Sequence, residues 1–156
     1  AVAAFAGVEL APAASGLGEV RVGHRLEELP GPNRSHLVDD AYNASPESML
    51  AAFETLAERP RQGRLLAVLG EMHELGALAA ESHQAVGRRA GEVFQEVAVV
   101  DVGNGRLLAE AAGAALVPDN EAAAAWVREH ARPGDLVLVK ASNGVRLHEL
   151  VELLRG

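Results

Sequence analysis

The chain has 156 residues, of which 49% are apolar and only 3% aromatic, which suits one domain, or one domain plus a remnant of another, with a core of small aliphatic side chains. Its formal net charge of −8 argues against sequence-independent nucleic-acid binding, which needs a basic face. It has no cysteine, hence no disulfide and no thiolate metal site, and no apolar run of the roughly 20 residues that would span a membrane. We therefore expect a cytoplasmic protein with neither a nucleic-acid nor a membrane partner.

Residues 1–22 are expected to form short helical pieces, broken by Gly7, Pro12 and the pair Gly16 and Gly18. No nearby strand pattern offers them a sheet partner. The chain also lacks an initiator methionine and a basic leader. These features predict a fragment of a longer protein.

A β-hairpin is predicted next. The runs 24–29 and 35–41 are strand-like, and the segment between them, "PGPNR" at 30–34, is rich in turn residues.

From residue 45 the chain alternates between helix and strand. Ser45 is a good helix N-cap, and Pro46 fits the first helical position of a helix over 45–58. One face of this helix is apolar: Met49, Leu50, Phe53 and Leu56. Further strands are expected at 64–70, 97–103, 114–117 and 135–141, with helices at 78–93, 105–113, 120–131 and 144–155.

The near-continuous apolar strands indicate an α/β fold, with a Rossmann-like, mostly parallel sheet covered by helices on both faces and preceded by the short hairpin. Ligands of such sheets bind outside the carboxyl ends of the strands. Polar residues follow four of the expected strands: Asp39, Asp40, Tyr42, Asn43 and Ser45; Glu71, His73 and Glu74; Asp101; and Lys140, Ser142 and Asn143. Several of these turns lead into helix N-termini, which offer N–H groups to anions.

Some of these residues also have a purely structural interpretation. Ser45 and Pro46 begin a helix in any fold, Lys140 could be a solvated charge, and Asp39 or Asp40 could cap a turn. A metal site at Glu71, His73, Glu74 and His83 is disfavoured, because their spacing matches no helical two-histidine motif. The chain also has no phosphate-binding P-loop, no G-x-G-x-x-G after a strand and no G-x-S-x-G elbow.

Four motifs in order carry a family resemblance: "DDAYNASPESM" (39–49), "VLGEMHELG" (68–76), "ESHQAVG" (81–87) and "VLVKASNGVRLHELV" (137–151). They resemble the carboxy-terminal domain of the Mur ligases, in particular the type that adds D-alanyl-D-alanine to UDP-N-acetylmuramoyl-tripeptide. The upstream "GHRLEEL" looks like the start of that domain. The resemblance implies that residues 23–156 form this domain and that 1–22 are the tail of the central ATPase domain.

The resemblance implies a three-domain, ATP-dependent ligase of peptidoglycan precursor synthesis. The amino-terminal domain would hold the UDP-sugar, and the central domain would hold most of the ATP and Mg²⁺. The tripeptide carboxylate would be activated as an acyl phosphate and attacked by the dipeptide amine. This chemistry belongs to central-domain residues, so no catalytic residue is expected in the chain, and the chain alone should not ligate.

Site residues follow by matching positions. The resemblance implies that Arg25 reaches the ATP phosphates, that Asp40 accepts hydrogen bonds from the ribose, and that Tyr42 and Asn43 lie beside the nucleotide. It assigns the D-alanyl-D-alanine side to Asn43, Ser45, Glu71, Lys140, Ser142 and Arg146. The family's "KGSR" turn is "KASN" here, so Ala141 replaces glycine and Asn143 replaces an arginine. Arg146, one helical turn on, is the candidate substitute for that arginine.

Three alternatives remain open. Asp39, Asp40, Asp101 and Lys140 lie roughly where a flavodoxin-like receiver domain has its phospho-acceptor pocket. The chain could also belong to another Mur ligase type. As a structural module without a site, it would tolerate mutation of Asp40, Lys140 or Ser142.

Overall fold

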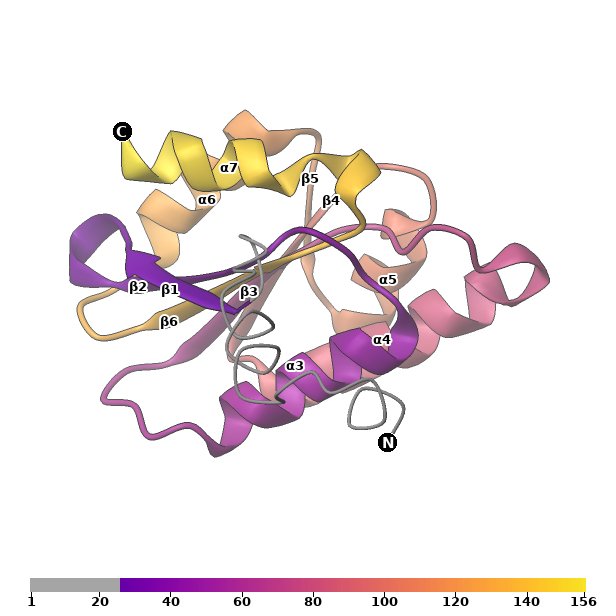
Figure 1. Cartoon of the computed structure of the whole chain (residues 1–156), viewed down its shortest axis with the longest axis horizontal. Helices are drawn as coiled ribbons and strands as arrows, with labels where there is room; N and C mark the ends of the chain where they lie inside the picture. Colours follow the sequence, from indigo (N-terminus) through magenta and orange to yellow (C-terminus); the bar gives the residue numbers. More distant parts are fainter. Residues whose placement is uncertain (1–25) are drawn as a thin grey trace, which may run out of the picture.

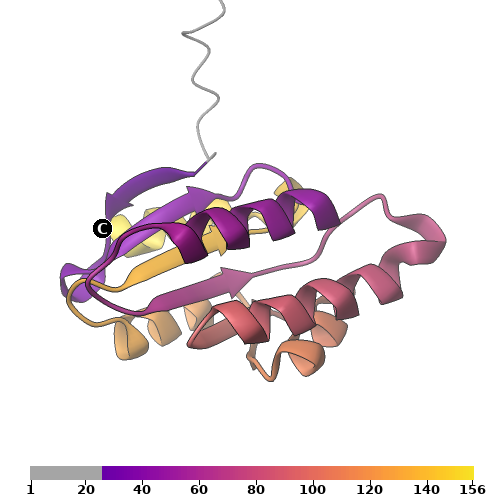
Figure 2. The same cartoon turned by 90° about the horizontal axis from the view of Figure 1, so that it is seen from below.

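The computed structural model describes residues 26–156, shown from two directions in Figures 1 and 2. Arg25 and the predicted boundary between residues 22 and 23 lie outside the described residues.

The predicted hairpin is confirmed. Strand β1 (Glu27–Pro30) pairs antiparallel with β2 (His36–Asp40), and the turn between them contains the short 3-10 helix η1 (Pro32–Arg34). Asn33 lies in this turn with a φ of 55°, and its side-chain amide donates to the carbonyls of Arg128 and Ala131. The hairpin turn is thereby attached to a segment almost a hundred residues further along the chain.

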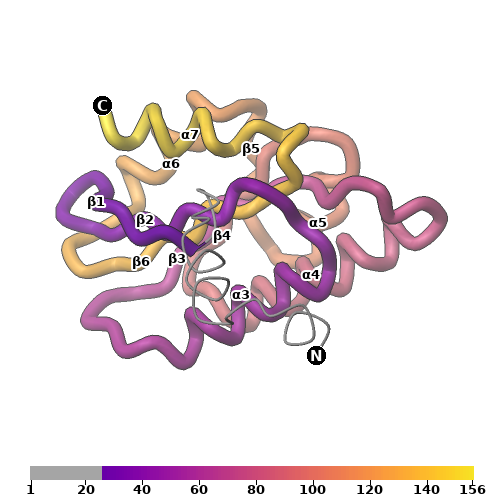
Figure 3. Tube along the Cα trace, viewed as in Figure 1, coloured from indigo at the N-terminus to yellow at the C-terminus, as the bar shows by residue number. Residues whose placement is uncertain are grey.

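The mostly parallel sheet is also confirmed. Its order is β1-β2-β6-β3-β4-β5, and every neighbouring pair after β1-β2 is parallel. The remaining strands are β3 (Leu65–Leu69), β4 (Glu96–Val100), β5 (Ala115–Val117) and β6 (Leu136–Lys140). The Cα trace in Figure 3 lets the reader follow β6, the last strand of the chain, to its place between β2 and β3.

Helices cover both faces of the sheet (Figure 1). They are α3 (Pro46–Glu58), α4 (Ala79–Val93), α5 (Gly105–Ala112), α6 (Asn120–His130) and α7 (Leu147–Arg155), with the 3-10 helices η2 (Gly76–Leu78) and η3 (Asn143–Val145). Helices α6 and α7 lie on one face, and α3, α4 and α5 lie on the other (Figures 1 and 2).

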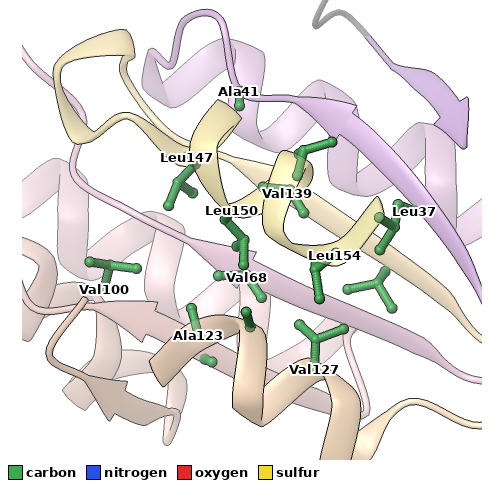
Figure 4. Close-up of a cluster of buried hydrophobic side chains, with 14 of the residues drawn as sticks. Leu37, Ala41, Val68, Val100, Ala123, Val127, Val139, Leu147, Leu150 and Leu154 are labelled. Carbon is green, nitrogen blue, oxygen red and sulfur yellow. The ribbon is translucent and has the colours of Figure 1, made fainter. Parts of the chain in front are cut away.

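Alternate residues of the parallel strands β2 to β6 point into two separate cores. Leu37 points into the core beneath α6 and α7, where Leu150 and Val127 meet the sheet (Figure 4). The next residue, Val38, points into the core beneath α3, α4 and α5. All five residues of β3 are buried, as expected for a parallel strand covered on both faces.

The last helix begins later than its sequence pattern predicts. Residues 143–145 form the 3-10 helix η3, and Arg146 has a left-handed φ of 61°, so α7 begins at Leu147. Among the helices of residues 26–156, none combines the length and the apolar character needed to cross a bilayer.

Candidate functional site

Strand β2 ends at the first of the predicted site segments. The loop after Asp40 is short, because Ser45 already begins α3. Its hydroxyl accepts from the N–H of Ser48 at 3.2 Å, and the Ser48 hydroxyl accepts in return from the N–H of Ser45 at 2.9 Å. This reciprocal capping box, with Pro46 in the first turn, fixes where the loop meets the helix.

A buried ion pair joins β2 to β6. In the parallel register Asp40 lies opposite Lys140, and the ammonium Nζ of Lys140 is 2.6 Å from Oδ2 of Asp40. The same Nζ donates to the carbonyl of Asn43 at 3.0 Å. The Lys140 side chain is 2% exposed, so the interpretation of a solvated lysine at this strand end is wrong. The buried ammonium is stabilised because the Asp40 carboxylate neutralises its charge and two oxygens accept hydrogen bonds from it.

A cavity of about 380 Å³ opens beside this ion pair. Four predicted site residues, Asp40, Asn43, Ser45 and Lys140, line it together. The rest of the lining comes from Leu26, just before β1, and from residues of α3: Ser48, Ala51, Ala52 and Thr55. The cavity thus combines a carboxylate, amide and hydroxyl groups and a helix N-terminus, which suits a polar ligand with hydroxyl or anionic groups.

Ser142 joins three segments at the same edge. It is 3% exposed, and its hydroxyl accepts from the N–H of His73 at 2.9 Å and donates to the carbonyl of Ala44 at 3.3 Å. Its backbone N–H donates to the carbonyl of Glu71 at 3.0 Å. Ser142 therefore lies near the cavity but is bonded to its own loops.

Glu71 binds the loop that follows β4. Its Oε1 accepts from both the N–H of Asn104, at 3.0 Å, and the side-chain amide of Asn104, at 2.8 Å. Its Oε2 is 3.3 Å from Nε2 of His73. Burial raises the pKa of Glu71, but the hydrogen bonds from Asn104 and the nearby His73 outweigh burial, so the pKa is lowered. The carboxylate is therefore a stable anion near neutral pH.

Like Glu71 and Ser142, the predicted residues Tyr42 and Arg146 are not part of the cavity lining. Tyr42 is 44% exposed in the loop between β2 and α3. Arg146 forms an ion pair with Glu149 on the first turn of α7, and its side chain is 66% exposed. The predicted roles of both residues, and that of Arg25, remain predictions.

Sequence reasoning missed two residues that organise this edge. The sequence indicates only a turn at Asn104, but in the structure this residue binds Glu71.

The second residue, His83, is fully buried. Its Nε2 accepts from the N–H of Met72 at 2.9 Å, and its Nδ1 lies 2.6 Å from the carbonyl of Ala79. This geometry assigns a neutral imidazole with the proton on Nδ1. The helical spacing of His83 with the buried Val86 and Ala90 was the available signal.

The sequence spacing of Glu71, His73, Glu74 and His83 disfavours a metal site at these residues. Within residues 26–156, no group of three or more acidic, histidine or cysteine side chains is arranged to hold a metal ion.

The receiver-domain alternative is wrong. In chain order, the parallel strands of this sheet lie first, fifth, second, third, fourth, whereas the flavodoxin-like order is 2-1-3-4-5. Asp101, which follows β4, pairs with Arg106 at 2.6 Å, and Lys140 at the end of β6 pairs with Asp40. Strand β3 lies between β4 and β6 and separates the two pairs. The three acids and the lysine therefore do not form one pocket.

Comparisons with known proteins agree with the motif order. The family model "Mur ligase, glutamate ligase domain" matches residues 24–143. The UDP-N-acetylmuramoyl-tripeptide–D-alanyl-D-alanine ligase of Mycobacterium tuberculosis (strain CDC 1551 / Oshkosh) is 37% identical over 156 positions, covering 84% of this chain and 31% of that protein. The Bacillus subtilis (strain 168) ligase of the same name is 34% identical over 164 positions, covering 97% of this chain and 35% of that protein.

A solved structure has the same fold. The MurF ligase from Thermotoga maritima in complex with ADP superposes with a TM-score of 0.77 at 30% identity, covering 92% of this chain and 35% of that chain. This chain thus spans about a third of the length of the proteins it matches.

Proposed function

Because the chain belongs to the Mur ligase family, we propose that it is the carboxy-terminal domain of an ATP-dependent ligase that adds D-alanyl-D-alanine to UDP-N-acetylmuramoyl-tripeptide. The observation that carries this proposal is the 37% identity, over 84% of the chain, to a relative of that name. The cavity beside Asp40 and Lys140 supports it, because Asp40, assigned to the nucleotide, lines it together with Ser45 and Lys140, assigned to the dipeptide.

In this proposal residues 23–156 form the carboxy-terminal domain and residues 1–22 are the tail of a central ATPase domain. The partners of the domain are the enzyme's own amino-terminal and central domains. The enzyme acts in the cytoplasm, without nucleic acid or membrane. Mg²⁺ and the phosphates of ATP are held mainly by the central domain, where the carboxylate is activated.

The chain's own contribution is to bind and orient the reactants. Among the described residues, Lys140 engages Oδ2 of Asp40, which leaves Oδ1 to accept hydrogen bonds from the ribose of ATP. Asn43 lines the same cavity, and Tyr42 lies exposed on the same loop. Holding both reactants in line accounts for a large part of the rate of such a reaction, because it removes their freedom to move relative to each other.

The test uses the full-length protein. Phosphate release from ATP should require both UDP-N-acetylmuramoyl-tripeptide and D-alanyl-D-alanine, and mass spectrometry should detect the pentapeptide product. Phosphate release with a single amino acid in place of D-alanyl-D-alanine would instead assign the chain to another Mur ligase type. The 156-residue chain alone should release no phosphate under the same conditions.

A further inference from the structure

Strand β6 ends between two loops that come from opposite sides of it. On one side is the β2–α3 loop (residues 41–45), and on the other is the segment after β3 (residues 70–75). The hydroxyl of Ser142 spans the gap between these two loops, with Ala44 on one side and His73 on the other.

The hydrogen-bonding capacity of this hydroxyl is largely used. A serine hydroxyl has one proton to donate, and Ser142 donates it to Ala44. One of its two acceptor positions is taken by His73, and the residue is 3% exposed. A group in this state is poorly placed to bind a substrate directly.

The loop that Ser142 holds is connected further along the edge. His73 packs against the turn after β6, because a Cβ on Gly144 would lie 2.5 Å from its Cε1 atom. Its Nε2 is 3.3 Å from Glu71, and Glu71 binds Asn104. A continuous set of contacts therefore runs from the cavity side of the edge, through Ser142, to the N-terminus of α5.

We propose that Ser142 is a positioning residue for ligation, one that fixes the β2–α3 loop against the segment after β3 without touching either substrate. This proposal rests on the proposed function, because its consequence is the relative placement of nucleotide and dipeptide. Loss of the hydroxyl leaves the His73 amide without its acceptor and releases Ala44. The two loops are then no longer held at a fixed separation. The rate of the chemical step falls, because a misplacement of the reactants by about 1 Å lowers that rate on the order of 100-fold.

The chain contains a matched control. Ser35 is also 3% exposed, and its hydroxyl also donates to a backbone carbonyl, that of Pro32 at 2.7 Å. It lies immediately before β2, at the opposite edge of the sheet from the cavity. Ser35→Ala therefore removes a buried hydroxyl and its hydrogen bond without changing the carboxyl edge.

The experiment measures kcat, the KM for ATP and the KM for D-alanyl-D-alanine in the full-length protein, together with the thermal unfolding temperature of each variant. Ser142→Ala should lower kcat about 10- to 100-fold and change the KM for ATP and for D-alanyl-D-alanine less than about threefold. Ser142→Thr keeps the hydroxyl and should retain most of kcat, whereas the nearly isosteric Ser142→Val should behave like the alanine variant. Ser35→Ala should lower the unfolding temperature as Ser142→Ala does but leave kcat at the parental value.

Two kinetic outcomes would overturn the proposal. One is a parental kcat in Ser142→Ala, and the other is a large rise in the KM for D-alanyl-D-alanine at unchanged kcat, which would make Ser142 a direct ligand. If the variants do not fold, amide hydrogen exchange in the parent decides, since the His73 N–H should be protected and rapid exchange contradicts the proposal. Failure of the proposed function is a separate result, in which the parent itself releases no phosphate with D-alanyl-D-alanine.

Discussion

The two edges of the sheet each contain a buried aspartate paired with a basic residue, but the surroundings of the two pairs differ. At the amino edge, Arg64 pairs with Asp135 at 2.8 Å, and its guanidinium also contacts Glu96 and the carbonyl of His130. At the carboxyl edge, Lys140 pairs with Asp40 at 2.6 Å and borders the cavity of about 380 Å³.

The difference separates a pair that is enclosed by the fold from a pair that borders the cavity of the proposed site. Asp135 accepts from the N–H groups of Arg64 and Arg132 as well as from the Arg64 side chain, so its oxygens are used in closing turns. Asp40 is engaged through Oδ2 and faces the cavity. A pair with every group satisfied stabilises structure, whereas a pair with an oxygen left toward a cavity can receive a ligand.

The largest effect is expected from Lys140→Met. The change leaves the Asp40 carboxylate buried without its cation, which should cost about 3–5 kcal/mol of unfolding free energy. Urea unfolding measures the loss, and ligation by the full-length protein should fall sharply. Asp40→Asn combined with Lys140→Met should recover much of the stability but not the activity. A loss no greater than that of Arg89→Met, which removes an exposed ion pair with Glu92, would contradict a buried pair.

At the amino edge, Asp135→Asn should cost about 2–3 kcal/mol, because it weakens charge-assisted hydrogen bonds. It should leave kcat unchanged, since the residue is at the edge away from the cavity. Asp101→Asn is the matched control, because its pair with Arg106 is more exposed and should cost less than about 1 kcal/mol.

Asp135 also gives the amino edge a dependence on pH. Burial raises the pKa of Asp135, but hydrogen bonds from Arg64 and Arg132 and the Arg64 charge outweigh burial, so the pKa is lowered. Its stabilisation is present above the unfolded-state pKa of an aspartate and is lost as the pH falls through the lower folded-state pKa. Urea unfolding across acidic pH should therefore show a smaller acid-induced loss in Asp135→Asn than in the parent. An identical pH dependence would contradict this assignment.

Gly103→Ala tests the link between Glu71 and the β4 loop. Gly103 has a φ of 52°, and a Cβ there would lie 2.0 Å from Oε2 of Glu71, so the carboxylate must move. Gly113 has a φ of 65°, and a Cβ added there would have no neighbour within 4 Å, so Gly113→Ala isolates the cost of the left-handed backbone. We expect about 1 kcal/mol for Gly113→Ala and about 2–3 kcal/mol for Gly103→Ala by thermal unfolding. Equal losses would show that Glu71 does not press on Gly103.

A small effect on stability is expected at two helix caps. Ser45 caps α3 beside the cavity, and Asp119 caps α6 by accepting from the N–H of Ala122 at 2.8 Å. Replacing either residue with alanine should cost about 1 kcal/mol. Only Ser45→Ala should also reduce ligation, because Ser45 lines the cavity. A similar loss of activity in Asp119→Ala would mean that helix stability, rather than the cavity, controls the rate.

Much of this architecture could be predicted because its signals are local. The alternation of apolar strands with helical patterns predicted the strands and α-helices of residues 27–155, and Ser45 caps α3 as its type suggests. The start of α7 was missed because Arg146 takes a left-handed conformation, which no helical periodicity reveals. His83 was missed as a loop anchor because its partner, the N–H of Met72, carries no side-chain signal.

The sequence by itself determined most of the elements, the cap of α3 and the apolar faces that enter the two cores, because these depend on neighbours within a few turns of the chain. Only the tertiary structure decided that β6 lies between β2 and β3. That order brings Lys140 to Asp40 across 100 residues and commits the hydroxyl of Ser142 to two other loops. The physical reason is that burial and strand pairing join residues by position in space, and a buried charge or hydroxyl must take the partner that the fold places beside it.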